Sequence, residues 1–315
     1  MNNIDFITIK KTSLYNVLMF SGFWAMQIFI TKLGFNSGAQ VLSFQLLSIL
    51  IAMVILVILI LPKYGTEIEF FVRKQPRLFW KLFFANGIQS GLGTCLSIIG
   101  ISLTSAINAG FLVKLATVST ILFAWIILKE RLTLIKVLMI STMLSGAYLL
   151  TTKGEVLLPR IGDFFILSAC VCWSIGNVLV RKYLKTQPVR VDLITLQKPF
   201  AGLPVILVLV GISVLNPDIF GELKGVMSCC NPPLSALPFT IGNGFFLAMT
   251  WIYLNNTLEV SSASYMTMMS MITPVIVSLL AMIFLGETLI WIQILGAGLI
   301  IMSGVVTYFS GISNE

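Results

Sequence analysis

Residues 261–307 read SSASYMTMMSMITPVIVSLLAMIFLGETLIWIQILGAGLIIMSGVVT, and residues 104–150 read TSAINAGFLVKLATVSTILFAWIILKERLTLIKVLMISTMLSGAYLL. The two stretches align without a gap at an offset of 157 residues. The matching pairs include Ser105/Ser262, Ala106/Ala263, Val118/Val275, Leu122/Leu279, Ala124/Ala281, Leu128/Leu285, Glu130/Glu287, Leu132/Leu289 and Leu138/Leu295. Self-similarity at a fixed offset is the signature of a repeated structural unit. We therefore expect the chain to contain two copies of one unit.

The composition places the chain in a lipid bilayer. Of its 315 residues, 57% are hydrophobic and 10% are charged, whereas soluble domains carry about 25% charged residues. So few charges cannot build a water-facing surface, which excludes a soluble enzyme and a disordered chain. The sequence contains no His, which excludes His-ligated metals and Ser-His or Cys-His catalytic pairs. No metal site or cofactor is indicated, because Cys170-x-Cys172 lacks the second ligand pair of a zinc site.

Apolar runs of membrane-spanning length recur along the whole chain. A helix needs about 20 apolar residues to cross the hydrocarbon, and these runs have that length. The predicted spans are 13–33, 39–61, 78–102, 104–128, 134–150, 162–184, 192–215, 236–258, 261–285 and 290–309. We therefore expect an all-α membrane protein of ten transmembrane helices, with a first five-helix repeat over 13–151 and a second over 162–309.

The basic residues indicate which way the chain crosses the membrane. With the N-terminus inside, the predicted inner segments contain 14 Lys and Arg and the outer segments contain 4. The remaining two, Lys114 and Lys198, lie within predicted helices. Cytoplasmic loops carry an excess of Lys and Arg. We therefore expect a multi-pass protein of the cell membrane (inner or plasma membrane) with both termini in the cytoplasm.

The number of spans in each repeat predicts how the two copies are related. Five is an odd number, so the second repeat crosses the membrane in the opposite sense to the first. Inverted repeats of this kind build secondary transporters, which bind a solute near the midplane between the halves and expose it alternately to either side. A channel would need a ring-forming filter or a ladder of Arg residues, and the sequence contains neither.

Short motifs recur in both halves of the chain. They are Thr104-Ser105-Ala106 and Leu128-Lys129-Glu130-Arg131 in the first half, Ser262-Ala263-Ser264, Thr273-Pro274-Val275 and Phe284-Leu285-Gly286-Glu287 in the second, and the pairs Trp24…Lys32 and Trp173…Arg181. In order and spacing they resemble the drug/metabolite transporter superfamily, in its EamA-type branch, over about 13–309. The first half departs from the pattern, with Thr117 opposite Pro274 and Lys129 opposite Gly286. The resemblance implies ten helices and transport of a small metabolite.

Two basic residues within predicted helices are the first candidates for solute binding. Lys114 lies about ten residues from either end of its span, roughly 15 Å at 1.5 Å per residue, which is too deep for its ammonium to reach an interface easily. A basic residue at that depth costs about 2.5–3.5 kcal/mol on insertion scales, so we expect it to face a cavity or a partner. Lys198 lies about two turns from the inner end of its span. At that depth its side chain is as well placed to extend to the membrane interface as to face a cavity.

Polar and aromatic residues within the helices are the next candidates. The carboxamides predicted to line a cavity are Gln45, Asn86, Gln89, Gln197 and Asn243, and hydrogen bonding between neighbouring helices is the alternative role for them. Trp24 and Trp173 lie near mid-helix, where an interfacial aromatic belt explains them poorly. We expect these two to form a wall for a flat or apolar solute, and Trp251 and Tyr253 fit either role.

The acidic residues restrict the charge of the solute. Glu130 and Glu287 lie at equivalent helix ends and are interpreted as helix-turn determinants, and no Asp or Glu lies in the central stretch of any predicted helix. Exchange of an organic cation for protons generally needs such a buried carboxylate. We therefore expect an exporter or exchanger of a small anionic or zwitterionic metabolite such as an amino acid, with a multidrug or cation exporter as the alternative.

Two other classes of membrane protein fit the sequence less well. An intramembrane enzyme would need Asp, Glu, His or Cys clustered at one membrane face, and the sequence indicates no catalytic residue. A non-transporting scaffold would not explain an inverted repeat with intramembrane Lys. The expected partners are the small-molecule substrate and the lipid bilayer, without nucleic acid, for a chain that acts as a monomer or homodimer.

Reporter fusions test the predicted orientation. Because the charge bias places both termini in the cytoplasm, a fusion at Ser313 is expected to report an inner position and a fusion at Gly225, in the 216–235 loop, an outer one. A pair of reporters that are active on opposite sides of the membrane measures this. Finding both positions on the same side would contradict the orientation.

Overall fold

The computed structural model describes residues 3–104, 106–187, 189–216, 218 and 233–310, so most of the predicted 216–235 loop lies outside the described residues. Within that part of the chain the structure is helical, and ten helical segments are long and apolar enough to span a membrane. In chain order the elements are α1 (Asn3–Asn36), α2 (Val41–Lys74), α3 (Pro76–Asn86), η1 (Gly87–Gly93), α4 (Thr94–Leu103), α5 (Ala106–Leu112), η2 (Val113–Leu115), α6 (Ala116–Phe123), η3 (Ala124–Leu128), α7 (Leu134–Thr152), α8 (Ile161–Thr186), α9 (Val191–Leu215), η5 (Leu234–Ala236), α10 (Leu237–Val260), α11 (Ala263–Met269), η6 (Ser270–Ile272), α12 (Thr273–Leu285) and α13 (Trp291–Phe309). The ten predicted spans are confirmed.

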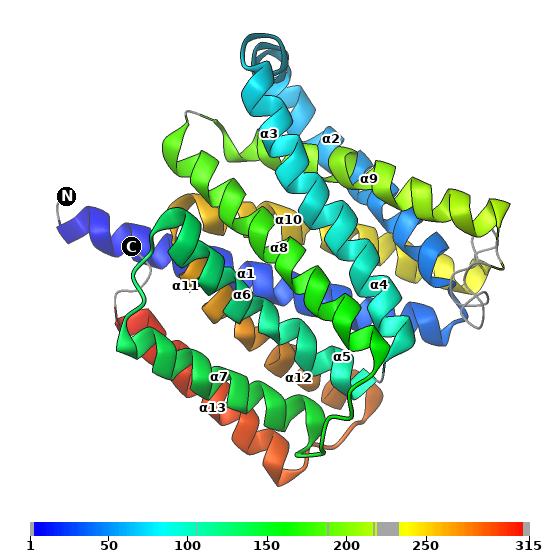
Figure 1. Ribbon diagram of the computed structural model, residues 1–315, viewed down its shortest axis with the longest axis vertical. Helices are drawn as coiled ribbons and strands as arrows, with labels where there is room; N and C mark the ends of the chain where they lie inside the picture. Colours follow the sequence, from blue (N-terminus) through cyan, green and yellow to red (C-terminus); the bar gives the residue numbers. More distant parts are fainter. Residues whose placement is uncertain (1–2, 105, 188, 217, 219–232, 311–315) are drawn as a thin grey trace.

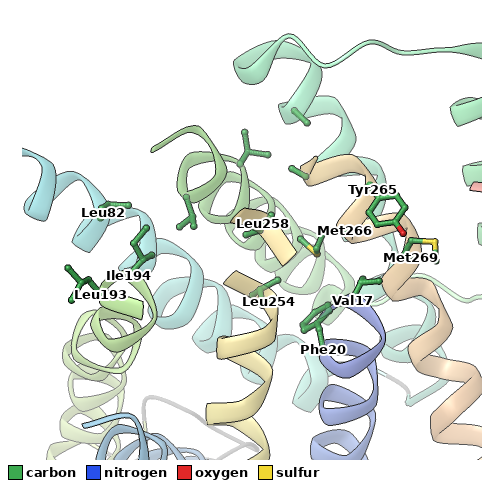
Figure 2. Close-up of a cluster of buried hydrophobic side chains, with 14 of the residues drawn as sticks. Val17, Phe20, Leu82, Leu193, Ile194, Leu254, Leu258, Tyr265, Met266 and Met269 are labelled. Carbon is green, nitrogen blue, oxygen red and sulfur yellow. The ribbon is translucent and has the colours of Figure 1, made fainter. Parts of the chain in front are cut away.

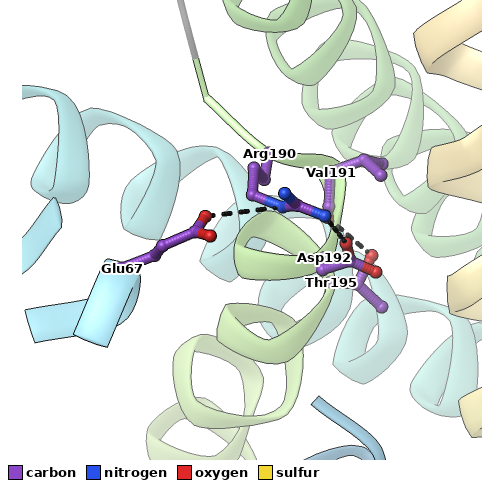
Figure 3. A network of polar contacts seen from close by, with 5 residues as sticks. All are labelled: Glu67, Arg190, Val191, Asp192 and Thr195. Atoms are coloured by element: carbon purple, nitrogen blue, oxygen red, sulfur yellow. Dashed lines mark hydrogen bonds and ion pairs between the residues drawn. The ribbon is translucent and has the colours of Figure 1, made fainter. Parts of the chain in front are cut away.

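α2 continues well beyond the predicted second span. The apolar run ends at residue 61, but the helix extends to Lys74 with a kink at Tyr64 (φ −132°, ψ 19°), two residues after Pro62. This extension and the start of α3 form a hairpin that protrudes from the bundle (Figure 1). Arg190, before α9, holds the extension. Its guanidinium lies 4.0 Å from the Tyr64 ring centroid, and its Nε lies 3.5 Å from a carboxylate oxygen of Glu67 (Figure 3). We call this side of the bundle the hairpin side.

The two repeats share their irregularities as well as their helices. The fourth span contains a 3₁₀ turn at Val113–Leu115 and the ninth contains one at Ser270–Ile272, which are the same positions at the offset of 157. Each of these spans also ends at a residue in the left-handed conformation, Lys129 (φ 57°) in the first repeat and Gly286 (φ 65°) in the second. Membrane crossing does not require such breaks, so their recurrence at equivalent positions identifies two copies of one unit.

The repeats interlock instead of lying side by side. α1 of the first repeat packs along α10 of the second, and in the equivalent arrangement α8 of the second packs along η1 and α4 of the first. Equivalent spans also meet directly: α2 contacts α9, the fourth span contacts the ninth through α6 and α11, and α7 lies beside α13 (Figure 1). The fold is therefore ten transmembrane helices in two inverted five-helix repeats.

A cluster of buried apolar side chains fills the bundle on the hairpin side. It combines residues of α1 and of the starts of α3, α9 and α11 with residues near the ends of α2, α8 and α10 and with Ala124 of η3, and Figure 2 shows part of it. Its members include Val17, Phe20, Leu82, Leu193, Ile194, Leu254, Leu258, Tyr265, Met266 and Met269. We call this cluster the apolar plug, because it leaves the hairpin side of the bundle closely packed.

Glu130 and Glu287 are equivalent in the repeat but differ in environment. Glu130 is buried, and its carboxylate accepts hydrogen bonds from the backbone N–H groups of Ala263 (3.0 Å) and Ser264 (3.2 Å) and from the Ser264 hydroxyl. The side chain of Glu287 is 53% exposed and forms an ion pair of 2.7 Å with Lys32. The first N–H groups of a helix lack partners within that helix. Glu130 is the acceptor for two of these N–H groups at the start of α11. It therefore joins the two repeats on the hairpin side.

The Glu130→Gln variant is expected to lower the melting temperature of the purified protein. The amide replaces charge-assisted hydrogen bonds at a buried helix start with weaker ones, a loss of about 1.5–3 kcal/mol. Glu287→Gln is the matched control, because it makes the same change at the equivalent position in an exposed ion pair, where little stability is lost. Thermal unfolding of both variants in lipid nanodiscs measures the difference. Equal shifts would contradict the assigned role of Glu130.

Candidate functional site

A cavity of about 220 Å³ lies between the two repeats. The lining residues are Phe20, Trp24, Gln27, Gln45, Gln89, Ser90, Thr94, Ala116, Thr120, Trp173, Asn177, Leu247, Thr250, Trp251, Leu254, Met266, Thr267 and Ser270. Phe20, Leu254 and Met266 also belong to the apolar plug, so the plug borders the cavity. Apolar walls with a few polar groups are typical of small-molecule sites.

Irregular helical turns lie at the cavity. The π-helical turn η1 contributes Gln89 and Ser90, and the 3₁₀ turn η6 contributes Ser270. In the first repeat, η2 directly precedes the lining residue Ala116. Irregular backbone at membrane depth is tolerated only where protein surrounds it or where it lines a cavity, and π and 3₁₀ turns within helices often mark functional sites. The breaks therefore support this cavity as the site.

Three tryptophans line the cavity, and Trp24 and Trp173 are the two predicted from the sequence. By sequence, Trp251 and Tyr253 fit either a cavity wall or an interfacial belt. Trp251 is the third tryptophan of the cavity, and Tyr253 is not among the lining residues. Trp173 fits closely against η1 because Gly93 has no side chain: a Cβ at that position would lie 2.7 Å from the indole. The aromatic wall is thus held by close packing of α8 on the third span.

Lys114 lies behind this aromatic wall. Its side chain is buried in η2, and its Nζ lies 4.8 Å from the centroid of the Trp24 ring. Phe20 stacks on the same indole, with ring centroids 5.5 Å apart. Lys114 does not itself line the cavity, and among the described residues no carboxylate forms an ion pair with it. Lys114 therefore contacts the cavity wall through Trp24 and is not itself one of the lining residues.

Lys198 begins a chain of polar side chains that ends at the cavity. It is fully buried, and its Nζ donates a hydrogen bond to Oε1 of Gln89. Gln89 in turn donates from Nε2 to Oδ1 of Asn177. Gln89 and Asn177 line the cavity, whereas Lys198 does not. The close approach depends on Gly176, where a Cβ would lie 2.5 Å from the Cβ of Gln89.

The other predicted carboxamides divide between the two roles that the sequence left open. Gln45 lines the cavity. Asn86 and Gln197 do not, and they join α3 to α9 through a hydrogen bond of 3.2 Å between their side chains. Asn243 is also outside the lining and donates to the hydroxyl of Ser48 at 2.8 Å, which joins α10 to α2. These three residues contribute to helix packing in this structure.

Two further lining residues, Gln27 and Asn177, are not among the candidates predicted from the sequence. Gln27 lies three residues after Trp24, and Asn177 lies four residues after Trp173. Residues three or four apart share a helix face, so spacing from the two tryptophans is the signal that finds them. The site therefore presents four carboxamides, and no Asp, Glu, Lys or Arg is found among its described lining residues.

A second hollow of about 210 Å³ lies elsewhere, against α1, α11, η6 and α13. Its walls are apolar side chains such as Leu14, Met268 and Ile301. Such walls offer few groups that fix the orientation of a solute. The cavity between the repeats is therefore the candidate site.

Comparisons with known proteins agree with this architecture. The EamA-like transporter family model matches residues 12–152 and 160–309. The uncharacterized transporter YyaM of Bacillus subtilis (strain 168) is 25% identical over 218 residues, which is 67% of this chain and 67% of YyaM. An uncharacterized transporter of Methanothermobacter thermautotrophicus is 24% identical over 233 residues, which is 71% of this chain and 63% of the archaeal protein.

A crystal structure among the solved structures that match has the same fold. It superposes on this chain with a TM-score of 0.72 at 16% identity, covering 96% of this chain and 97% of its own. Such a likeness shows a common architecture and no common substrate. The family matches, by contrast, span most of the sequence in two segments. The chain belongs to the EamA-like transporter family of the drug/metabolite transporter superfamily, and it is a multi-pass membrane transporter and not an enzyme.

Proposed function

We propose that this protein is a secondary transporter that exports or exchanges a small anionic or zwitterionic metabolite, such as an amino acid. One observation carries the proposal: two lysines contact the cavity wall from behind, while the described lining residues include no carboxylate. Lys114 contacts Trp24, and Lys198 contacts Gln89. Neither ammonium has an acidic partner among the described residues.

Electrostatics favour an anionic group on the solute. Attraction between opposite charges is much stronger in a low-dielectric interior than in water, and an unpaired buried cation costs several kcal/mol. A solute carboxylate beside Lys114 or Lys198 offsets part of that cost. A cationic solute gains no such partner, and it must share the π face of Trp24 with an ammonium that lies 4.8 Å from the ring centroid.

The packing next to the cavity supports alternating access. The apolar plug borders the cavity on the hairpin side, which is the cytoplasmic side in the orientation that the basic residues predict. We infer that this packing separates the site from the cytoplasm in the arrangement described above. Rocking one inverted repeat against the other exchanges the sealed side, which supports transport across the membrane by this cavity.

Metabolite profiling tests the proposed function directly. Metabolites are compared inside and outside cells with and without the protein, and the solute that changes is then assayed for flux in proteoliposomes. The proposal expects a solute that carries a carboxylate or a similar anionic group at neutral pH. A permanent organic cation as the only transported solute would contradict it.

Substitutions at Lys114 are expected to reduce flux of that solute. Lys114→Ala and Lys114→Gln remove the charge behind Trp24 and are expected to lower flux at least about tenfold, equivalent to 1.4 kcal/mol. Lys114→Arg keeps the charge, so flux retained in this variant alone indicates a purely electrostatic role. The exposed Lys182→Gln is the control for a lysine away from the cavity. Normal flux in Lys114→Ala at normal expression would contradict the role of this residue.

A further inference from the structure

The hydrogen bond between Lys198 and Gln89 fixes the direction of a carboxamide. A lysine ammonium has three N–H donors and no acceptor, so it contacts a carboxamide only through the amide oxygen. The fully buried Lys198 makes this contact with Oε1 of Gln89. The NH₂ group of Gln89 must therefore point away from Lys198.

The direction of Gln89 in turn fixes that of Asn177. The NH₂ group of Gln89 only donates, and it meets Oδ1 of Asn177. Asn177 is half-buried and lines the cavity. Its own NH₂ group is thereby turned away from Gln89, and no described residue accepts a hydrogen bond from it. Two N–H donors therefore remain available at the cavity wall.

Packing around the chain of contacts keeps it in place. The hydroxyl of Ser90 donates to the backbone oxygen of Lys198 at 2.9 Å, which joins η1 to α9. On the other side of η1, Gly176 lets α8 approach so closely that a Cβ there would lie 3.0 Å from the backbone oxygen of Ala85. Gln89 is thus held between α8 and α9, and exchange of its amide oxygen and nitrogen would break its contacts with both Lys198 and Asn177.

We propose that the NH₂ group of Asn177 binds an acceptor oxygen of the transported solute, such as a carboxylate oxygen, and that Lys198 and Gln89 are positioning residues that set its polarity. This inference rests on the proposed function for the presence of an anionic group on the solute. Each hydrogen bond in a chain of aligned bonds polarises the next one. The ammonium of Lys198 therefore strengthens, through Gln89, the two N–H donors of Asn177 at the cavity wall.

The Gln89→Glu variant separates this role from simple packing. A carboxylate at this position still accepts a hydrogen bond from Lys198 and adds a charge pair, so the fold is retained. It has no donor, however, so Asn177 must turn its NH₂ group toward it and present its oxygen to the cavity. The expected result is an inverted polarity at the site. Asn177→Leu, which removes the donors, is the second variant.

Benzoate and benzamide are the probes, because they share a flat ring that suits the tryptophan wall and differ in whether the polar group only accepts or also donates. Binding is followed by tryptophan fluorescence of the purified protein in lipid nanodiscs. The native protein is expected to favour benzoate by about tenfold or more, the effect of one hydrogen bond to a charged group. Gln89→Glu is expected to abolish or reverse the preference, and Asn177→Leu to abolish it.

The control is Gln197→Glu, which adds a buried carboxylate next to Lys198 in the chain but outside the cavity lining, and it is expected to keep the preference. No preference in the native protein, or a preference that survives both Gln89→Glu and Asn177→Leu, would overturn the inference. If profiling identifies an anionic solute whose flux depends on Lys114 while these variants change nothing, this inference fails and the proposed function stands.

Discussion

Every backbone N–H and C=O group in the hydrocarbon must find a partner inside the protein, and the rest of this structure depends on that constraint. Helices satisfy it wherever they are unbroken. Where they begin within the bundle, side chains take over. At the start of α11, Glu130 accepts from the N–H groups of Ala263 and Ser264, and the hydroxyl of Ser262 accepts from the N–H of Tyr265, which follows them, at 3.1 Å. These acceptors come from both repeats, Glu130 from the first and Ser262 from the second. Together they allow the ninth span to begin inside the bundle.

The same constraint explains why the cavity and the helix breaks occur together. A break leaves backbone groups that need partners, and side chains from neighbouring helices supply them only where the helices pack tightly. The glycines at 93 and 176 provide that packing around η1. The polar side chains that satisfy the breaks then remain at the edge of the cavity. Ser90 shows this, because it lines the cavity while its one hydroxyl hydrogen is shared between the backbone oxygens of Asn86 and Lys198. Polarity at the site is thus partly a product of helix architecture.

Much of the fold follows from the sequence, because span length and a repeat offset are properties of the chain alone. The extension of α2 to Lys74 does not follow, since hydropathy falls after residue 61 while the helix continues, held by Arg190 from a distant segment. The site is predicted less completely. Asn86 and Gln89 lie three residues apart, and both contact α9, Asn86 through Gln197 and Gln89 through Lys198. Only Gln89 also lines the cavity, because it reaches Asn177 of α8 as well, and spacing along the sequence does not distinguish the two residues.

The position of Gln89 has a thermodynamic consequence. It belongs to the first repeat, yet its two partners, Lys198 and Asn177, belong to the second. Separation of η1 from α9 breaks the contact with Lys198, and separation of η1 from α8 breaks the contact with Asn177, so either movement breaks this bridge. Coupling between two equilibria is reciprocal, so a ligand that binds more tightly to the bridged arrangement stabilises the contact between the repeats by the same free energy. In a transport cycle that must break this contact, the best-bound solute is also the one most slowly released.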